Sequence, residues 1–184
     1  MRSNNQAIAE GEIISELIFN HEISGEKFYL VDLRVNGSKD DEDVIPLMVS
    51  EGLVDVPQSY TGMRVKAEGQ LHSYQEENRL KNYLLVGEWN VSEIKGEMQN
   101  RNQIYLEGYI VSVYETKSQE GRVADMMLAV DREHGESDYI PCICFGQTAV
   151  SAGKLEVGNH VAVWGGIQNR GQIRVSVDKI ECLK

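Results

Sequence analysis

Hydrophobic and polar residues alternate along several short stretches of this chain. Val31, Leu33 and Val35 are separated by single polar residues, and the same period of two runs through residues 126–130. Alternation of this kind is typical of a β-strand that buries one face. The only stretch of the second half with helical character is short, at residues 147–154. The pattern therefore predicts an all-β fold with at most one short helix in each half.

The chain also repeats itself. Three blocks recur in the same order at offsets of 97, 95 and 96 residues: 6–14 with 103–111, 43–46 with 138–141, and 62–71 with 158–167. Such a period indicates a duplicated structural unit.

In each copy the pattern predicts three strands, then a short connection that is helical in the second copy, and then two more strands. This is the order of the five-stranded OB barrel. Gly11, Gly69, Gly108 and Gly165 fall inside predicted strands, where glycine permits the sharp coiling of a small barrel. We therefore predict two tandem five-stranded OB-fold barrels, residues 1–97 and 98–184, joined by the polar segment Lys95–Asn102.

Length and composition agree with two small domains. The chain has 184 residues, 41% of them hydrophobic, and no apolar run long enough for a membrane span or a signal peptide. Cys142, Cys144 and Cys182 make an odd number of cysteines with no CxxC motif, which favours a reducing cytoplasm over a disulfide framework. Cys142 and Cys144 share a strand face, where two core residues are a better interpretation than a metal site, since no His/Cys cluster completes a ligand set.

Four segments of the second copy resemble, in order, the strands of the bacterial and phage single-stranded-DNA-binding proteins. They are Asn102–Gly108, Glu120–Val130, Asp138–Gly146 and Val157–Arg170. The first copy keeps the framework but matches the family less well. In that family two aromatic residues, six apart on the third strand, stack against bases. The resemblance implies that Tyr139 and Phe145 take this role here.

The residue pattern of the third strand supports the same assignment. One face of the strand carries small apolar residues and should face the core: Ile140, Cys142 and Cys144. Tyr139 and Phe145 then point outward, where stacking on a ring contributes about 1–3 kcal/mol per base regardless of base identity. The alternative is that both rings cover an interface or a second core.

Basic residues near this expected groove would neutralise phosphates, which supplies much of the affinity of such binders. The first loop and the outward side of the fourth strand add further aromatic and basic candidates. The predicted nucleic-acid contacts are Tyr139, Phe145, Trp164, Arg122, Arg132, Arg170, Arg174, Tyr114 and Lys117.

The first copy differs in chemistry. The positions of the two stacking rings hold Val44 and Ser50, and residues 1–97 carry 9 Lys and Arg against 18 Asp and Glu, compared with 9 against 11 in residues 98–184. We therefore interpret its binding face as degenerate. Val44, Pro46 and Met48 form an apolar stripe on the side of the third strand that carries the stacking rings in the second copy. We expect this stripe to join two chains in a homodimer.

Motifs of catalysis are missing from the sequence. It has no GxxxxGK[ST], GxSxG or HExxH motif, and its four histidines are scattered. We predict a non-catalytic protein with no cofactor and no metal, which binds single-stranded DNA independently of sequence in replication, recombination or repair, with RNA left open as a ligand. The alternative function is a protein–protein interaction module, or a replication scaffold with an acidic surface.

Overall fold

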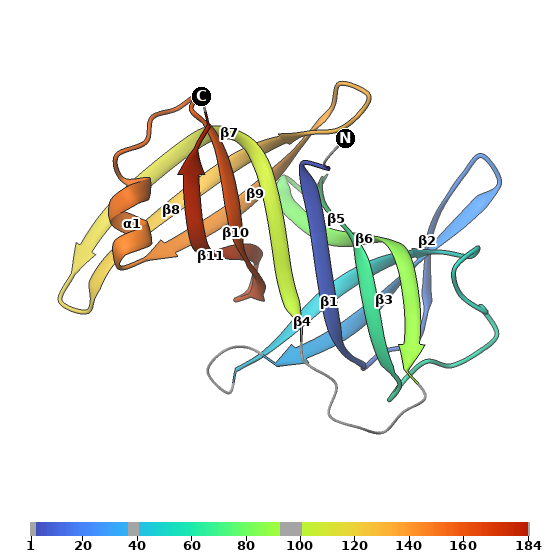
Figure 1. The fold of residues 1–184 in the computed structure, drawn as a ribbon. Helices are drawn as coiled ribbons and strands as arrows, with labels where there is room; N and C mark the ends of the chain where they lie inside the picture. The colour runs from blue at the N-terminus through green and yellow to red at the C-terminus, as the bar shows by residue number, and fades with distance from the viewer. Residues whose placement is uncertain (1–2, 37–40, 93–100, 184) are drawn as a thin grey trace.

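A computed structural model describes residues 3–36, 41–92 and 101–183. The described chain is built almost entirely of antiparallel β-strands (Figure 1). The predicted boundary between residues 97 and 98, and most of the predicted linker Lys95–Asn102, lie outside the described residues. The elements are β1 (Asn5–Ile13), β2 (Ile18–Ile23), β3 (Glu26–Asn36), β4 (Glu42–Ser50), β5 (Arg64–Glu76), β6 (Arg79–Ser92), β7 (Asn102–Ser118), β8 (Gly121–Asp131), β9 (Ser137–Phe145), α1 (Gln147–Ala152), β10 (His160–Asn169) and β11 (Ile173–Cys182).

Two closed circuits of strands confirm the tandem OB-fold prediction. In the first barrel the pairing runs β1–β3–β4–β6–β5 and returns to β1. In the second it runs β7–β8–β9–β11–β10 and returns to β7. Each barrel closes through one short parallel contact, β4 with β6 and β9 with β11. Helix α1 follows β9, within the stretch predicted to be helical.

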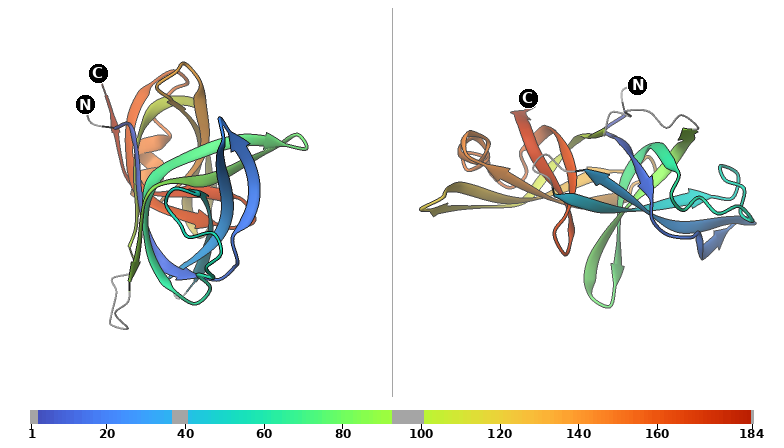
Figure 2. Two further views of the ribbon diagram at one scale, coloured as in Figure 1. Left: turned by 90° about the vertical axis from the view of Figure 1, so that its right-hand side faces the viewer. Right: turned by 90° about the horizontal axis from the view of Figure 1, so that it is seen from below.

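The opening strand differs between the copies. In the second barrel β7 is continuous but bulges between Ile110 and Ser112. At the same place in the first copy, after Ile13, the strand stops, and pairing resumes as β2. The Ser15 side chain occupies this break and accepts a hydrogen bond from the backbone N–H of Asp32 at 2.8 Å. Beyond this break β2 and β3 form a hairpin, which corresponds to the β7–β8 hairpin of the second barrel (Figure 2).

The two barrels are joined by antiparallel pairing of β1 with β7. Ala7 pairs with Ile104, its own counterpart 97 residues later, and Asn5 and Ala9 pair with Leu106 and Asn102. The pairing is therefore centred on a pseudo-twofold axis that exchanges the copies. Side chains obey the same symmetry, because Asn5 bridges the backbone of Leu71 and Asn102 bridges that of Ile167, the counterpart of Leu71.

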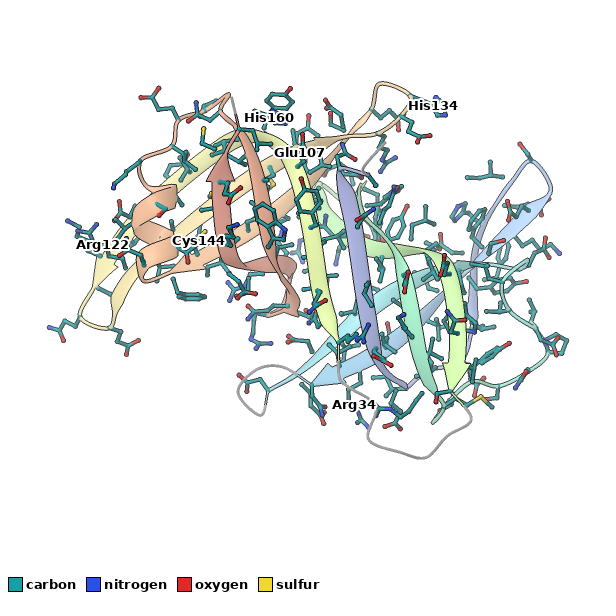
Figure 3. The ribbon with its side chains drawn as sticks, viewed as in Figure 1. Arg34, Glu107, Arg122, His134, Cys144 and His160 are labelled. Atoms are coloured by element: carbon teal, nitrogen blue, oxygen red, sulfur yellow. The ribbon has the colours of Figure 1, made fainter. Side chains whose placement is uncertain are left out.

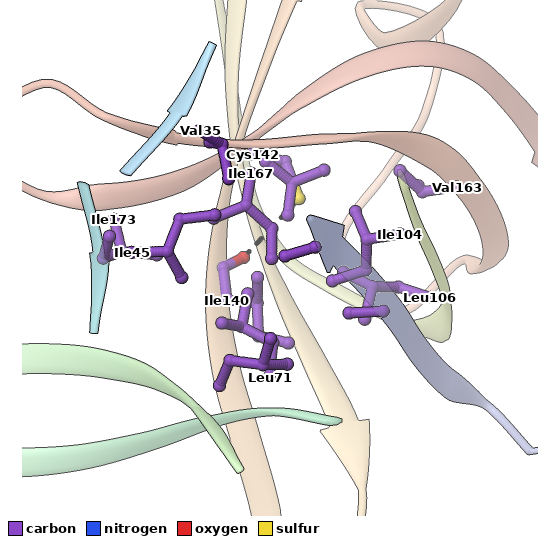
Figure 4. Close-up of a cluster of buried hydrophobic side chains, with 14 of the residues drawn as sticks. Val35, Ile45, Leu71, Ile104, Leu106, Ile140, Cys142, Val163, Ile167 and Ile173 are labelled. Atoms are coloured by element: carbon purple, nitrogen blue, oxygen red, sulfur yellow. Dashed lines mark hydrogen bonds between the residues drawn. The ribbon is translucent and has the colours of Figure 1, made fainter. Parts of the chain in front are cut away.

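Buried side chains form one apolar cluster that includes residues of both barrels. Figure 4 shows Ile45 and Leu71 of the first barrel close to Ile140, Ile167 and Ile173 of the second. These side chains are all less than a tenth exposed. The hydrophobic effect that holds each barrel together therefore also holds the barrels against each other.

Glycine is required where two strands of each barrel meet at a bulge. The pairing of β5 with β6 shifts at Gly69, and that of β10 with β11 shifts at Gly165. A Cβ atom at Gly69 would overlap the carbonyl oxygen of Leu85, and one at Gly165 would overlap that of Ser176. Both copies thus use glycine to coil the barrel, as the sequence predicted.

Candidate nucleic-acid interface

The outer face of β7, β8 and β9 carries four exposed aromatic rings. Strand register places the outward side chains in rows, with Tyr109, Ala129 and Tyr139 in one row and Tyr114 and Phe145 in the third and fourth rows. We call this surface the aromatic face and define it by the rows 109–129–139, 112–127–141, 114–125–143 and 116–123–145. The side chains of Tyr109, Tyr114, Tyr139 and Phe145 are 45%, 71%, 44% and 50% exposed.

The inward side of β9 explains why the rings point outward. Ile140, Cys142 and Cys144 are buried in the core, as predicted. Successive side chains of a strand point to opposite sides, so Tyr139 and Phe145 face away from the barrel. The sequence also predicted Tyr114 as a contact, and the register puts it on the same face. Tyr109 was not predicted, although its position in the row of Tyr139 makes it part of the face.

The middle strand separates the rings of the aromatic face. Its outward residues are Ala129 between Tyr109 and Tyr139, Val123 opposite Phe145, and Met127 and Asp125 in the two rows between. One side of the Tyr109 ring stacks on His160, with ring centroids 4.6 Å apart, and the exposed Asp125 lies beside Tyr114. A nucleic-acid base can stack on the ring surfaces that stay exposed.

Two of the predicted basic contacts lie on the other side of the β7–β8 hairpin. Lys117 pairs with Arg122 near the tip, on the phase opposite to Tyr114 and Phe145. Arg122 is visible at this end of the molecule in Figure 3, and its guanidinium forms an ion pair with Glu115 at 3.2 Å. Lys117 is exposed. The hairpin tip therefore presents its cations beside the aromatic face rather than on it.

Arg132 fastens the second barrel to the first. Its Nε donates to Asp138 Oδ2 at 2.9 Å and its Nη2 donates to the carbonyl oxygen of Ser73 in β5. Asp138 is only 1% exposed and also accepts from the backbone N–H of Ser73 at 2.7 Å. The hydrogen bond that Arg132 donates to the Asp138 carboxylate raises the pKa of Arg132. Arg132 is thus engaged in the contact between the two barrels, and its predicted role in binding nucleic acid stays a prediction.

Arg170 has the corresponding role across the pseudo-twofold axis. Its guanidinium donates to Asp43, the first-copy counterpart of Asp138, which is 2% exposed. Asn169, beside it in the β10–β11 turn, donates its backbone N–H to Asp43 and its side-chain N–H to the carbonyl oxygen of Val44. Arg170 is thus also engaged between the barrels.

The stripe of Val44, Pro46 and Met48 is not the exposed surface that we expected. Met48 is 4% exposed, and Val44 and Pro46 are half-buried. The β10–β11 turn of the same chain binds the backbone at Val44 and lines a cleft that includes Pro46. This contact within one chain removes the basis for a homodimer through the stripe.

The cleft between the barrels carries cations that remain outside these ion pairs. It has a volume of about 510 Å³ and is lined by the β5–β6 hairpin, the β10–β11 turn and Pro46. Arg79 and Lys81 contribute from the hairpin, together with Tyr74. Figure 2 shows this hairpin projecting from the barrels. Its base touches the aromatic face, because Asn82 donates to the carbonyl oxygen of Tyr139 at 3.0 Å.

Arg174 and Trp164 occupy different surroundings. Arg174 precedes Val175, which pairs with Cys142 of β9, so Arg174 lies alongside the middle of the aromatic face. Trp164 lies on β10, packed on Tyr105 with ring centroids 5.2 Å apart and with the Lys179 ammonium 4.5 Å from its ring centroid. Since β11 lies between β10 and β9, Trp164 is not brought together with Tyr139 and Phe145.

In the described chain no group of three or more His, Cys, Asp or Glu residues is arranged to hold a metal ion. Burial raises the pKa of Cys142, and it raises that of Cys144 to about 12, so both thiols stay protonated at neutral pH. A protonated thiol is a poor nucleophile and a poor metal ligand. The described part of the chain also contains no helix long and apolar enough to cross a membrane.

No protein-family model and no curated protein sequence matches this chain. Among solved structures it is similar to the wild-type single-stranded DNA binding protein from Thermus aquaticus, at 18% identity and a TM-score of 0.83 over 100% of this chain and 95% of that one. A deletion mutant of that protein gives 19% identity and a TM-score of 0.77 over 100% and 96%. The N-terminal domain of PriB from Thermoanaerobacter tencongensis is 32% identical over 50% of this chain and 100% of that one, with a TM-score of 0.45. The full-length likeness shows that this chain has the tandem OB-barrel fold of the Thermus aquaticus protein.

Proposed function

We propose that this protein binds single-stranded DNA without regard to sequence and without catalysis. The observation that carries the proposal is the aromatic face, where four rings on β7 and β9, the two strands that flank β8, are at least 44% exposed. A ring that stays exposed loses hydrophobic stabilisation, which a stacked base would restore. The tandem barrel fold shared with the single-stranded DNA binding protein from Thermus aquaticus supports the same function.

The proposed path of the single-stranded DNA follows β9 and continues onto the first barrel. Bases stack on Phe145, Tyr114 and Tyr139, and the backbone then passes the β5–β6 hairpin into the cleft beside Arg79 and Lys81. The hydrogen bond between Asn82 and Tyr139 supports this route, because it brings the hairpin to the end of the aromatic face. Arg174 would neutralise a phosphate alongside the aromatic face, and Lys117 would do so at the hairpin tip, where the DNA passes round to the other side of the hairpin.

Titration of fluorescently labelled oligo-dT with the full chain tests the proposal by anisotropy at low salt. We expect saturable binding, equal binding of oligo-dC, weaker binding of duplex DNA of the same length, and loss of affinity as salt rises. Oligo-U in the same assay separates DNA from RNA as the preferred ligand. Absence of binding at low salt, or tighter binding of duplex, would contradict the proposal.

We further propose a homodimer, acting in DNA replication, recombination or repair in the reducing cytoplasm that the free cysteines favour. The supporting surface is the broad outer side of β10, β7, β1, β5 and β6, which runs across both barrels. Half-buried Ile8, Tyr105 and Trp164 lie at its centre, beside a shallow pocket of about 380 Å³. Light scattering at physiological salt should give about twice 20.7 kDa, and a mass near 20.7 kDa would contradict the dimer.

A further inference from the structure

The first barrel has its own outer face on the β2–β3 hairpin, and its chemistry is different. Strand register places Ile18 beside Leu30, His21 beside Phe28, and Ile23 beside Glu26. We call these six residues the β2–β3 face. Ile18 is 64% exposed and Ile23 is 58% exposed, so aliphatic side chains remain open to water at the end of the molecule opposite to the β7–β8 hairpin (Figure 1).

The second copy serves as an internal comparison for this face. The row Tyr109–Ala129–Tyr139 is replaced by Glu12, Arg34 and Val44, in which Glu12 and Arg34 form an ion pair at 2.8 Å. The row of Phe145 is replaced by His21, Phe28 and Ser50. Ile23 corresponds to the polar Ser118 at the tip of the second copy, and Ile18 corresponds to Tyr114 of the aromatic face. The barrel therefore does not need Ile18 and Ile23 for closure.

Strand β2 offers a free edge for pairing. Among the described strands it pairs with β3 alone and stands at the end of the sheet order. It contains no proline, lysine or arginine, which commonly protect an edge strand against further pairing, and its pairing with β3 is irregular only between Phe19 and His21. An extended peptide can add to such an edge through backbone hydrogen bonds, and its alternate side chains then lie on the flanking face.

Carboxylates surround the hairpin. Glu16, Glu22, Glu26 and Glu51 lie on it or next to it, and none of them forms an ion pair with a described lysine or arginine. Hydrogen bonds from Ser59 and Thr61 lower the pKa of Glu16. Glu26 and Glu51 are held close to the sheet, by the Ser50 hydroxyl and by the backbone N–H of Lys27. Lys27 is the only lysine or arginine between residues 16 and 33.

We propose that the β2–β3 face docks an extended segment of a partner protein in which apolar residues alternate with lysine or arginine. The segment adds to the free edge of β2, places its apolar side chains over Ile18, Ile23 and Phe28, and pairs its cations with the surrounding carboxylates. The two rings of the face, His21 and Phe28, already stack on each other with ring centroids 4.9 Å apart. The other apolar side chains are aliphatic and the carboxylates repel phosphates, so single-stranded DNA is the less suitable occupant. A second copy of this chain is also less suitable, because pairing β2 with β2 would bring the carboxylates around both hairpins to one edge, where like charges repel.

The test uses the full-length chain and a labelled seven-residue peptide of alternating lysine and valine. The matched peptide with glutamate in place of lysine is the first control. We expect the basic peptide to bind, to shift the backbone amide resonances of residues 18–30, and to leave those of residues 139–145 unchanged. The double variant Ile18→Ser with Ile23→Ser, and the variant Glu22→Lys, should each weaken binding at least tenfold.

Two control variants remove similar groups elsewhere. Val157→Ser removes an aliphatic side chain that is 70% exposed, and Glu133→Lys reverses an exposed charge in the β8–β9 turn, and both should bind the basic peptide like the unmodified chain. Equal weakening by the control variants, or equal binding of the glutamate peptide, would overturn the proposal. Oligo-dT that shifts residues 18–30 and competes with the peptide would assign this face to nucleic acid instead. Failure of oligo-dT to bind the aromatic face would leave the peptide result unaffected, so the two proposals fail separately.

Discussion

Replacement of Tyr139 or Phe145 by alanine should weaken the binding of oligo-dT while leaving the fold intact. Each ring is about half exposed, at 44% and 50%, and neither belongs to the buried core. Complete burial of a large apolar side chain is worth about 1.5–3 kcal/mol, so removing a half-buried one should cost about 1 kcal/mol of unfolding free energy. In a chain of this size, that lowers the melting temperature by about 2–4 °C.

The loss of affinity should be larger. Stacking of one base contributes about 1–3 kcal/mol, which corresponds to a factor of about 5 to 150 in the dissociation constant for each ring. Tyr139 and Phe145 are six residues apart on one strand, about 20 Å at the rise of a β-strand, so their effects should add. The double variant should therefore lose about 2–6 kcal/mol of binding free energy.

Anisotropy titration with labelled oligo-dT at constant low salt measures the affinity, and differential scanning calorimetry of the same samples measures stability. Phe19→Ala is the matched control, because Phe19 is an aromatic ring that is 54% exposed on the β2–β3 hairpin. It should leave the affinity for oligo-dT unchanged. A double variant of Tyr139 and Phe145 that binds like the unmodified chain would refute the assignment of the aromatic face. A fall of more than about 10 °C in melting temperature would place the rings in the core instead.

Four further results are expected. Asp138→Ala leaves the backbone N–H of Ser73 without its acceptor and should cost about 2–4 kcal/mol in chemical denaturation, within one transition for both barrels; two separate transitions would contradict the shared core. Gly165→Ala should cost about 2–3 kcal/mol because the new methyl group overlaps a backbone carbonyl, whereas Gly87→Ala, whose nearest neighbour would be 3.8 Å away, should be nearly neutral by the same measurement. Four cations are expected to contact phosphates: Arg79, Lys81, Lys117 and Arg174. At about −0.7 each, the logarithm of the oligo-dT association constant should fall with the logarithm of salt concentration at a slope of about −3. A slope near zero would show that these four cations are not part of the interface. Burial lowers the pKa of His72 below 6.5, so the native state binds fewer protons than the unfolded state, and stability should fall as pH drops below about 6.5; His72→Gln should flatten this part of the pH profile, and an unchanged profile would point to another group.

Much of the fold could be predicted from local patterns. Alternation placed Ile140, Cys142 and Cys144 in the core, and the recurrence of three blocks predicted two barrels before any pairing was known. The first prediction depends only on neighbours in sequence, since the side-chain period of a strand follows from backbone geometry, and the second depends only on comparing the sequence with itself. The same reasoning placed Tyr139 and Phe145 outside the barrel.

The partners of the arginines could not be predicted in this way. Arg132 and Arg170 lie next to the expected groove in sequence, but Ser73 and Asp43 reach them only once the barrels pack together. The pairing of β1 with β7 leaves no local signal, because Ala7 and Ile104 are ordinary strand residues. Tyr109 was missed for a related reason, since its place beside Tyr139 depends on a bulge at Val111 that shifts the register of β7.

The pairing of β1 with β7 also has a consequence for dilute solutions. When two barrels on separate chains associate, the fraction that is paired falls as the protein is diluted. Here both strands belong to one polypeptide, so each barrel meets its partner at an effective concentration set by the connecting chain. The strand-to-strand contact and the cleft beside it therefore persist at any protein concentration, including the few molecules of a single small cell.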